Sequence, residues 1–319
     1  MGAYAMNLQQ FKFVRETVRR DYNLTEAARA LYTSQPGVSK AIIELEDELG
    51  VKIFERHGKR IKGLTKPGVA VAQIVDRIMR EVDNLKKVSD EFARRDEGGL
   101  TIACTHTQAR YALPKVIPAF RKQYPKVHLS LIQGSPAQLA EMVLSEQADL
   151  AVATEALEQT AGLVTMPCYS WEHVVVVPPD HPLADLTSSQ ARNLSLEQLA
   201  SYPLITYDRA FTGRSAMDSA FNAKDIHPDF VLEAIDADVI KTYVELGMGV
   251  GIIAGVAYDI RRDPGLVGIP VGHLFGMHTS RLGVKGGVFL RDFVYTFIEL
   301  LAPELNRDHV QNAISPSQD

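Results

Sequence analysis

The segment from Lys66 to Arg95 constrains the fold of this chain more than any other feature. Its apolar residues recur every three or four positions, which places them in one narrow stripe along a long helix. Either the chain's own body or a second copy of the helix must cover such a stripe, and we favour dimerisation. The run Asp96-Glu97-Gly98-Gly99 ends the helix. The sequence therefore predicts a head (1–65), a linker and dimerisation helix (66–97) and a body (98–319).

The head has the pattern of a helix-turn-helix. Two short amphipathic segments meet at a tight turn, and the second begins Ser34-Gln35-Pro36. Serine is a good helix cap, and proline fits the first turn because it has no amide hydrogen to lose. Asn23 and Thr25 are capping candidates for the preceding helix. Two short helices joined in this way form a DNA-reading motif.

A basic hairpin, or wing, is expected after this motif. The strand-like runs 51–56 and 61–65 flank the turn His57-Gly58-Lys59-Arg60. Residues 1–66 hold 12 Lys and Arg against 8 Asp and Glu, which gives a net charge of +4. Because the whole chain has a net charge of −5, the remaining residues carry −9. A basic head on an acidic body indicates a nucleic-acid partner at one end only.

The predicted DNA contacts follow from this geometry. The amino-terminal residues of the second helix enter the major groove, where Gln35 can bond adenine and Lys40 can reach base edges or phosphates. Wing cations meet the backbone, so binding to double-stranded DNA should be salt-sensitive. A +4 head binds weakly alone, and two linked heads would supply the missing affinity. The predicted DNA-binding residues are Thr25, Ser34, Gln35, Pro36, Ser39, Lys40, Arg56, Lys59 and Arg60.

The body alternates strands and helices, which indicates an α/β multidomain protein with parallel strands. We expect two Rossmann-like subdomains, I (98–169 and 271–319) and II (170–270), arranged as in periplasmic binding proteins. The crossovers between the subdomains are expected near 169–170 and 270–275. We also expect a helix over 113–124 and a strand near 283–288. A ligand is expected between the subdomains, at the carboxyl ends of the strands.

Threonines mark this expected ligand site. Thr105 and Thr107 follow a strand and open a helix, Thr212 precedes another helix, and Thr154 ends a third strand. Hydroxyl groups and free amides at helix starts suit a small oxoanion such as sulfate, or a small carboxylate such as acetylserine. Each threonine could instead be a plain helix cap. The predicted effector-binding residues are Thr105, Thr107, Gln108, Gln133, Ser135, Thr154 and Thr212.

Composition excludes several other classes of protein. No apolar run approaches the ~18 residues that span a bilayer, and no secretory signal is visible, so we expect a cytoplasmic protein without a membrane partner. Cys104 and Cys168 cannot form a disulfide framework. No nucleophile, cofactor or metal-ligand motif is present, so we expect neither an enzyme nor a metal site, and no cofactor. Gly247-Met248-Gly249-Val250-Gly251 is expected to be a turn rather than a dinucleotide motif.

The head resembles a specific family. Its motif string runs Leu24-Thr25-x-Ala27-Ala28-x-x-Leu31-x-x-Ser34-Gln35-Pro36-Gly37-Val38-Ser39, followed by Leu45-Glu46-x-x-Leu49-Gly50. This string is similar to the amino-terminal domain of LysR-type transcriptional regulators. In the body, Thr105-His106-Thr107-Gln108-Ala109-Arg110-Tyr111, Phe211-Thr212-Gly213-Arg214-Ser215 and Asp236-Ala237-Asp238-Val239-Ile240-Lys241 resemble the CysB-type branch of that family.

The resemblance implies a transcriptional activator that controls sulfur assimilation, cysteine synthesis and sulfonate use. Such regulators form homodimers and homotetramers on promoter DNA and work with RNA polymerase. The resemblance also implies that Thr105, Thr107, Gln108, Thr154 and Thr212 contact a small-molecule anion. The alternative is an oxoanion-binding module, similar to periplasmic sulfate receptors, with no transcriptional role.

Overall fold

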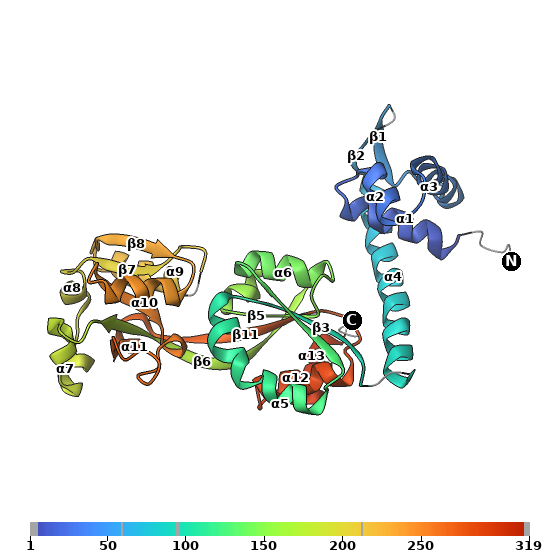
Figure 1. The fold of residues 1–319 in the computed structure, drawn as a ribbon. Coiled ribbons are helices and arrows are strands. Elements are labelled where there is room, and N and C mark those ends of the chain that lie inside the picture. The colour runs from blue at the N-terminus through green and yellow to red at the C-terminus, as the bar shows by residue number, and fades with distance from the viewer. Residues whose placement is uncertain (1–5, 59, 94–95, 212, 316–319) are drawn as a thin grey trace. The chain divides into compact units, whose positions relative to one another are not determined.

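The computed structural model describes residues 6–58, 60–93, 96–211 and 213–315. The chain divides into two compact units, Met1–Ala93 and Arg94–Asp319, each with its own hydrophobic core (Figure 1). Separate cores mean that each unit contains the apolar contacts that stabilise it. Within the described ranges, no helix combines the length and the apolar character needed to cross a membrane.

The first unit begins with a winged helix-turn-helix. Its helices are α1 (Leu8–Arg19), α2 (Leu24–Ala30) and α3 (Gln35–Leu49), and β1 (Phe54–His57) pairs antiparallel with β2 (Arg60–Leu64). Gly50 ends α3 in the left-handed conformation, with φ of 68°, as glycine does most readily. The apolar faces of these elements meet in a core that includes Val14, Val38, Ile42, Leu45 and Phe54.

Helix α4 (Lys66–Ala93) completes the first unit. Val75 and Met79 are buried against the core of the head, so the beginning of the predicted apolar stripe is covered by its own chain. Further along, Leu85 is 70% exposed and Phe92 88% exposed. The stripe thus divides into a part that packs on the head and a part that remains uncovered within this unit.

The first lobe of the second unit is built on parallel strands, as predicted. Strand β3 (Gly98–Cys104) lies between β4 (Val127–Gln133) and β5 (Leu150–Ala153). Side chains alternate between the two faces of β3, so Ile102 packs in the cluster that contains residues of α12, while Ala103 packs in the cluster that contains residues of α6. The helices of this lobe are α5 (Ile117–Gln123), α6 (Pro136–Leu144), α12 (Asp292–Leu301) and α13 (Arg307–Ile314), with the short turns η1 (Gln108–Ala112), η2 (Leu113–Lys115) and η3 (Glu155–Gln159).

The second lobe repeats this layered arrangement. Its strands are β7 (Leu204–Tyr207), β8 (Phe230–Ala234), β9 (Val250–Ala254) and β10 (Val267–Pro270). Residues of α10 (Ala237–Glu245) pack in one apolar cluster, and residues of α8 (Leu196–Leu199), α9 (Arg214–Asn222) and α11 (Gly272–Phe275) pack in another. The remaining elements are α7 (Ser188–Arg192), η4 (Pro182–Asp185) and η5 (Gly255–Ala257).

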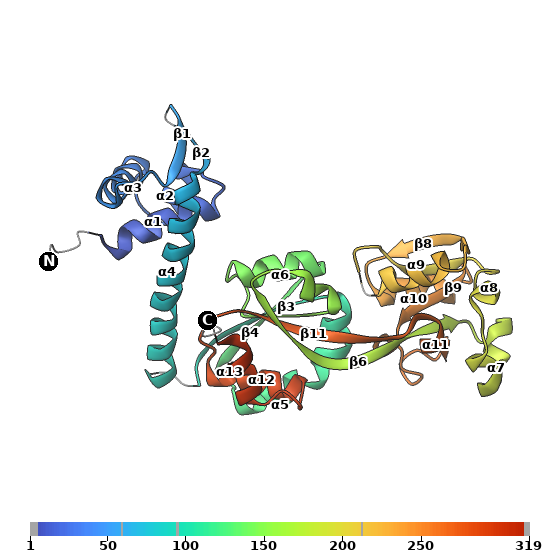
Figure 2. The same ribbon diagram turned by 180° about the vertical axis from the view of Figure 1, so that it is seen from behind.

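Two long antiparallel strands, β6 (Leu163–Val177) and β11 (Met277–Lys285), join the lobes (Figures 1 and 2). They link all strands of the body into one sheet, in the order β4-β3-β5-β11-β6-β9-β7-β8, with β10 also on β6. Their pairing shifts at Cys168, because Ser280 lies opposite Tyr169 while Arg281 lies opposite Pro167. This irregularity is a β-bulge, a feature that bends a strand locally.

The structure confirms the predicted crossover near 169–170, which lies within β6, and corrects the other crossover, one strand and one helix. Residues 270–275 were expected to cross between the lobes, but they form the end of β10 and α11, and β11 makes the crossing. The strand expected at 283–288 begins earlier, at Met277. The helix expected over 113–124 is broken into η2 and α5.

Candidate functional site

Local capping builds the amino terminus of α3, the predicted DNA-reading helix. The Ser34 hydroxyl accepts a hydrogen bond from the Gly37 amide at 3.3 Å, and Pro36 occupies the first turn. Asn23, rather than Thr25, caps α2, because its side chain accepts from the Thr25 amide at 3.1 Å. Both helices of the motif therefore start where the sequence predicts.

Residues from α2, α3 and β2 line an open hollow of about 450 Å³ on the head. Thr25, Gln35 and Arg60 lie around it, although they come from separate elements. These are members of the predicted DNA-contacting set, and the structure brings them together. The other lining residues are Asp21, Tyr22, Asn23, Leu24 and Ile61.

The other predicted DNA residues lie on α3 and on the wing. Ser39 is half-buried, and Lys40 is 80% exposed, with its Nζ 3.7 Å from a Glu44 oxygen. On β1, Arg56 has its Nε and Nη2 atoms buried without a hydrogen-bond partner. A guanidinium with unused donors suits phosphate well. Lys59 lies outside the described residues.

Polar side chains lie buried where the neighbouring strands β3 and β5 end. Thr105 follows β3 and is 1% exposed, and Thr154 follows β5 and is 4% exposed. Thr107 and Gln108, each 2% exposed, continue from Thr105 into η1. Burying hydroxyl and amide groups costs free energy unless they find hydrogen bonds, so this group differs from an ordinary apolar core.

The hydrogen bonds of these residues show which of them has unused capacity. Gln108 donates from Nε2 to the Ser280 hydroxyl at 3.3 Å and accepts from the Tyr169 hydroxyl. Thr107 lies in hydrogen-bonding contact with the phenol of Tyr207, whose pKa is raised above its usual value by burial. The Thr105 Oγ1 atom is buried and has no hydrogen-bond partner. Thr105 thus retains a hydroxyl for a ligand.

Sequence reasoning missed Tyr169, Tyr207 and Ser280, which complete this polar group. Ser280 follows Gln108 by 172 residues, and Tyr169 follows it by 61. No local pattern around these residues marks them as partners. The pairing of β6 with β11 brings Tyr169 and Ser280 together beside Gln108, whereas Tyr207 comes from β7.

The structure does not bury every predicted effector residue with the threonines. Gln133 is exposed at the end of β4, and Ser135 caps α6 by accepting from the Gln138 amide at 3.5 Å. Thr212 lies outside the described residues. The capping role explains why a serine stands at position 135 without requiring a ligand.

Gly213, which follows Thr212, packs against the strands that join the lobes. Its φ is +66°, and a Cβ there would lie 2.7 Å from the ring of His173 and 2.9 Å from that of Trp171. Both rings contact His278, which stacks on Trp171 with centroids 4.6 Å apart. Glycine is therefore required for this turn to approach the rings closely.

One group of possible metal ligands occurs among the described residues. His106, Asp236 and Asp238 place their ligand atoms within 4.8 Å of one another. However, the Asp238 carboxylate already pairs with Arg110 at 3.1 Å and lies 3.4 Å from the Lys241 ammonium. These cations disfavour a metal ion at the same carboxylate.

Comparison with known families decides the identity of the chain. Residues 8–69 match the model described as bacterial regulatory helix-turn-helix protein, lysR family. Residues 93–306 match the LysR substrate binding domain. The chain belongs to the LysR family. A LysR regulator binds DNA through the helix-turn-helix and a small-molecule effector through the substrate-binding domain, and the family consists of transcriptional regulators rather than enzymes.

Individual LysR regulators resemble this chain over nearly its whole length. It is 59% identical over 309 residues to the HTH-type transcriptional regulator CysB of Burkholderia cenocepacia, covering 97% of each chain. It is 56% identical over 305 residues to the regulator SsuR of the same organism, covering 96% of this chain and 97% of that one. The cofactor-binding domain of the Cbl transcriptional regulator superposes with a TM-score of 0.64 at 43% identity, covering 68% of this chain and 93% of that one.

Proposed function

We propose that this LysR-family regulator controls genes of sulfur assimilation and cysteine metabolism in the cytoplasm. Its effector is a small anionic metabolite, either sulfate, acetylserine or a related sulfur compound. The resemblance of its body motifs to the CysB-type branch, and its similarity to CysB and SsuR, support this assignment. The match to the helix-turn-helix model disfavours the alternative of an oxoanion-binding module without a transcriptional role.

The unpartnered hydroxyl of Thr105 is the observation that most directly supports a small anion as the effector. It is buried beside the end of β5, where Thr154 follows, and Thr107 lies two residues further along the chain. Neutral hydroxyl donors bind an oxoanion without the cost of burying a full cationic charge. A small anion with several oxygen acceptors fits these donors better than a bulky aromatic molecule does.

Thr105→Val tests this site, because valine keeps the shape and removes the hydroxyl. Calorimetric titration with sulfate and with acetylserine should show an affinity at least roughly tenfold weaker, since a hydrogen bond to a charged group contributes about 1.5–3 kcal/mol. Thr17→Val is the matched control, because Thr17 is also a fully buried threonine with an unpartnered hydroxyl, but it lies in the head. Unchanged affinity in Thr105→Val would contradict the proposal.

We further propose that the residues around the hollow of the head contact operator DNA. Gln35→Ala should weaken specific binding by about 1–3 kcal/mol and leave effector binding intact. Gln9→Ala is the matched control, because Gln9 is an exposed glutamine at the start of α1. Equal operator affinity of Gln35→Ala and wild type in an anisotropy titration would show that the reading face is elsewhere.

The proposed active assembly is a homodimer or homotetramer that binds promoter DNA and contacts RNA polymerase. The exposed apolar residues of α4, Leu85 and Phe92, support dimerisation through this helix, because water-exposed apolar side chains gain free energy when covered. Sedimentation of Phe92→Glu should show a weaker dimer than wild type. An unaltered mass distribution would exclude this part of α4 from the interface.

A further inference from the structure

Tyr111 comes from the first lobe but packs in the apolar core of the second. It lies in η1, which begins at Gln108 and directly follows Thr105 and Thr107 along the chain. Tyr111 is 8% exposed and belongs to a cluster with Val176, Ile240 and other second-lobe residues. A side chain inserted in this way holds two lobes together through buried apolar area.

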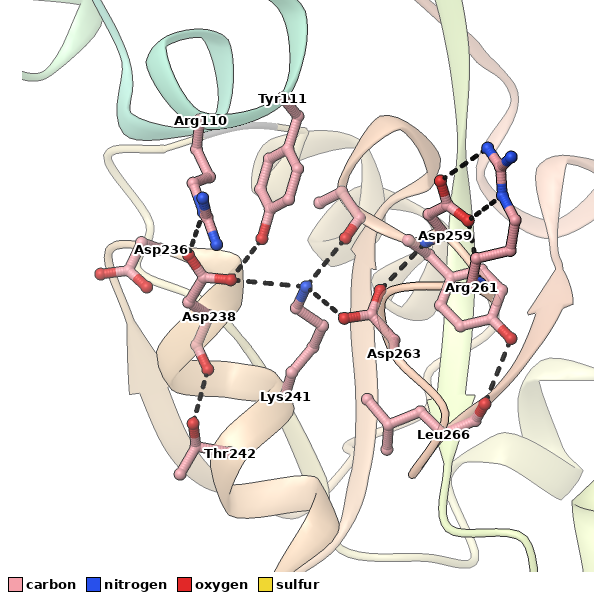
Figure 3. Close-up of polar contacts among 12 residues, drawn as sticks. Arg110, Tyr111, Asp236, Asp238, Lys241, Thr242, Asp259, Arg261, Asp263 and Leu266 are labelled. Carbon is pink, nitrogen blue, oxygen red and sulfur yellow. Dashed lines mark hydrogen bonds and ion pairs between the residues drawn. The ribbon is translucent and has the colours of Figure 1, made fainter. Parts of the chain in front are cut away.

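Asp238, in α10 of the second lobe, receives polar contacts from the same turn of the first lobe (Figure 3). The Tyr111 hydroxyl donates to its Oδ1 atom at 2.5 Å, and the Arg110 Nε donates to its Oδ2 atom at 3.1 Å. Both oxygens of one carboxylate therefore hold neighbouring residues of η1. Hydrogen bonds to a charged acceptor are stronger than neutral ones.

Lys241 anchors this carboxylate within the second lobe. Its Nζ lies 3.4 Å from Asp238, donates to Asp263 at 2.9 Å and donates to the Ala257 carbonyl at 3.1 Å (Figure 3). It also lies 5.0 Å from the centroid of the Tyr111 ring, within the range of a cation–π contact. The contacts of η1 thus reach several elements of the second lobe.

The charge of Asp238 is maintained in this environment. Burial alone would raise its pKa, but the hydrogen bond from Tyr111 and the positive charges of Lys241 and Arg110 outweigh burial and lower the pKa below its usual value. The carboxylate is therefore ionised at neutral pH and keeps both contacts with η1.

Because the proposed effector site is buried, the contacts of Arg110 and Tyr111 with Asp238 can control access to it. Thr105, Thr107 and Gln108 are 1–2% exposed, so a ligand can reach them only after the lobes move apart. Any such movement separates Tyr111 and Arg110 from Asp238, because they belong to opposite lobes. Contacts broken in the rate-limiting opening set the rates of ligand entry and exit.

We propose that Arg110, Tyr111 and Asp238 form an interlobe clasp that sets how fast a small oxoanion effector enters and leaves its site. This inference rests on the proposed effector site. The clasp is closed in this structure, and we assign the same contacts to the ligand-bound protein, so weakening the clasp destabilises both closed states alike. Association and dissociation then both accelerate, while the dissociation constant changes little.

Tyr111→Phe and Asp238→Asn test the clasp in the full-length protein. Without ligand, hydrogen exchange at the amides of residues 105–112 should accelerate by roughly tenfold, the effect of losing a hydrogen bond to a charged group. Tyr258→Phe and Asp259→Asn are matched controls, because Tyr258 donates to the Leu266 carbonyl and Asp259 pairs with Arg261 inside the second lobe (Figure 3). The controls should exchange like wild type.

The second measurement is the kinetics of sulfate and acetylserine binding, followed by stopped-flow fluorescence of Trp171. Both rates should rise by roughly tenfold in the clasp variants, with less than a threefold change in the dissociation constant. General damage to the site would weaken binding without faster association. Arg110→Met gives a further variant that the fold should tolerate, because the Arg110 side chain is 59% exposed.

Exchange or association rates equal to those of wild type would overturn the clasp. Weaker binding without faster association would overturn it as well, because the variants would then act on the site itself. If wild type binds neither sulfate nor acetylserine, the proposed effector class is wrong, and hydrogen exchange alone still decides whether the clasp exists.

Discussion

Replacing Glu46 with alanine should destabilise the head while leaving the body intact. Glu46 lies in α3 and is 1% exposed, and its Oε1 atom accepts from the amides of Ile53 at 2.9 Å and Phe54 at 3.1 Å. The substitution leaves two buried N–H groups without partners, at about 1–3 kcal/mol each. The ion pair with Lys52 adds little, because that lysine is 61% exposed and such pairs contribute about 0–1 kcal/mol. The expected loss in the free energy of unfolding is about 2–6 kcal/mol.

Urea unfolding of the full-length chain separates this effect from the stability of the body. The only tryptophan, Trp171, lies in the body, so its fluorescence reports that unit, whereas far-ultraviolet circular dichroism reports both. Glu46→Ala should add an early dichroism transition without shifting the fluorescence transition. Glu44→Ala, an exposed truncation on the same helix, should change neither. A dichroism curve for Glu46→Ala that matches wild type would refute the reasoning.

Further predictions concern titration and thiol reactivity in the body. The pKa of His173 is lowered to about 3 by burial and by His278, so the unfolded chain takes up its proton first and stability falls as pH drops below about 6.5. Urea titrations across this range should show that wild type loses up to about 1.4 kcal/mol per pH unit relative to His173→Leu, and parallel curves would exclude the effect. Burial raises the pKa of Cys104 and of Cys168 to about 12. Cys104 is also fully buried, so its thiol should not react with iodoacetamide before unfolding, and the partly exposed Cys168 should react slowly. Rapid labelling of the native protein, read by mass spectrometry, would contradict this burial.

Features that depend on local chemistry could be predicted from the sequence. The start of α3 follows from Ser34 and Pro36, and the end of that helix follows from Gly50, because capping involves residues within one turn. The parallel strands β3, β4 and β5 follow from their alternation with helices. The burial of Thr105 and Thr154 agrees with their positions at strand ends.

Features that depend on distant contacts could not be predicted. Strand β6 begins at Leu163 and continues past Pro167, because pairing with the distant strand β11 extends it. The contact between Tyr111 and Asp238 joins residues 127 positions apart, and no local signal pairs them. Tyr111 and Asp238 appear in the sequence only as members of two separate motifs that resemble the CysB-type branch.

The most direct test of the account is whether the effector changes DNA binding. Fluorescence anisotropy should measure the affinity of the full-length protein for DNA from its own upstream region, with and without saturating sulfate or acetylserine. We expect the effector to change this affinity by about 5–150-fold in wild type, the usual range of allosteric coupling. In Thr105→Val, the effector concentration that gives half of this change should be at least roughly tenfold higher. Identical affinities in wild type with and without either effector would contradict the coupling of the two units.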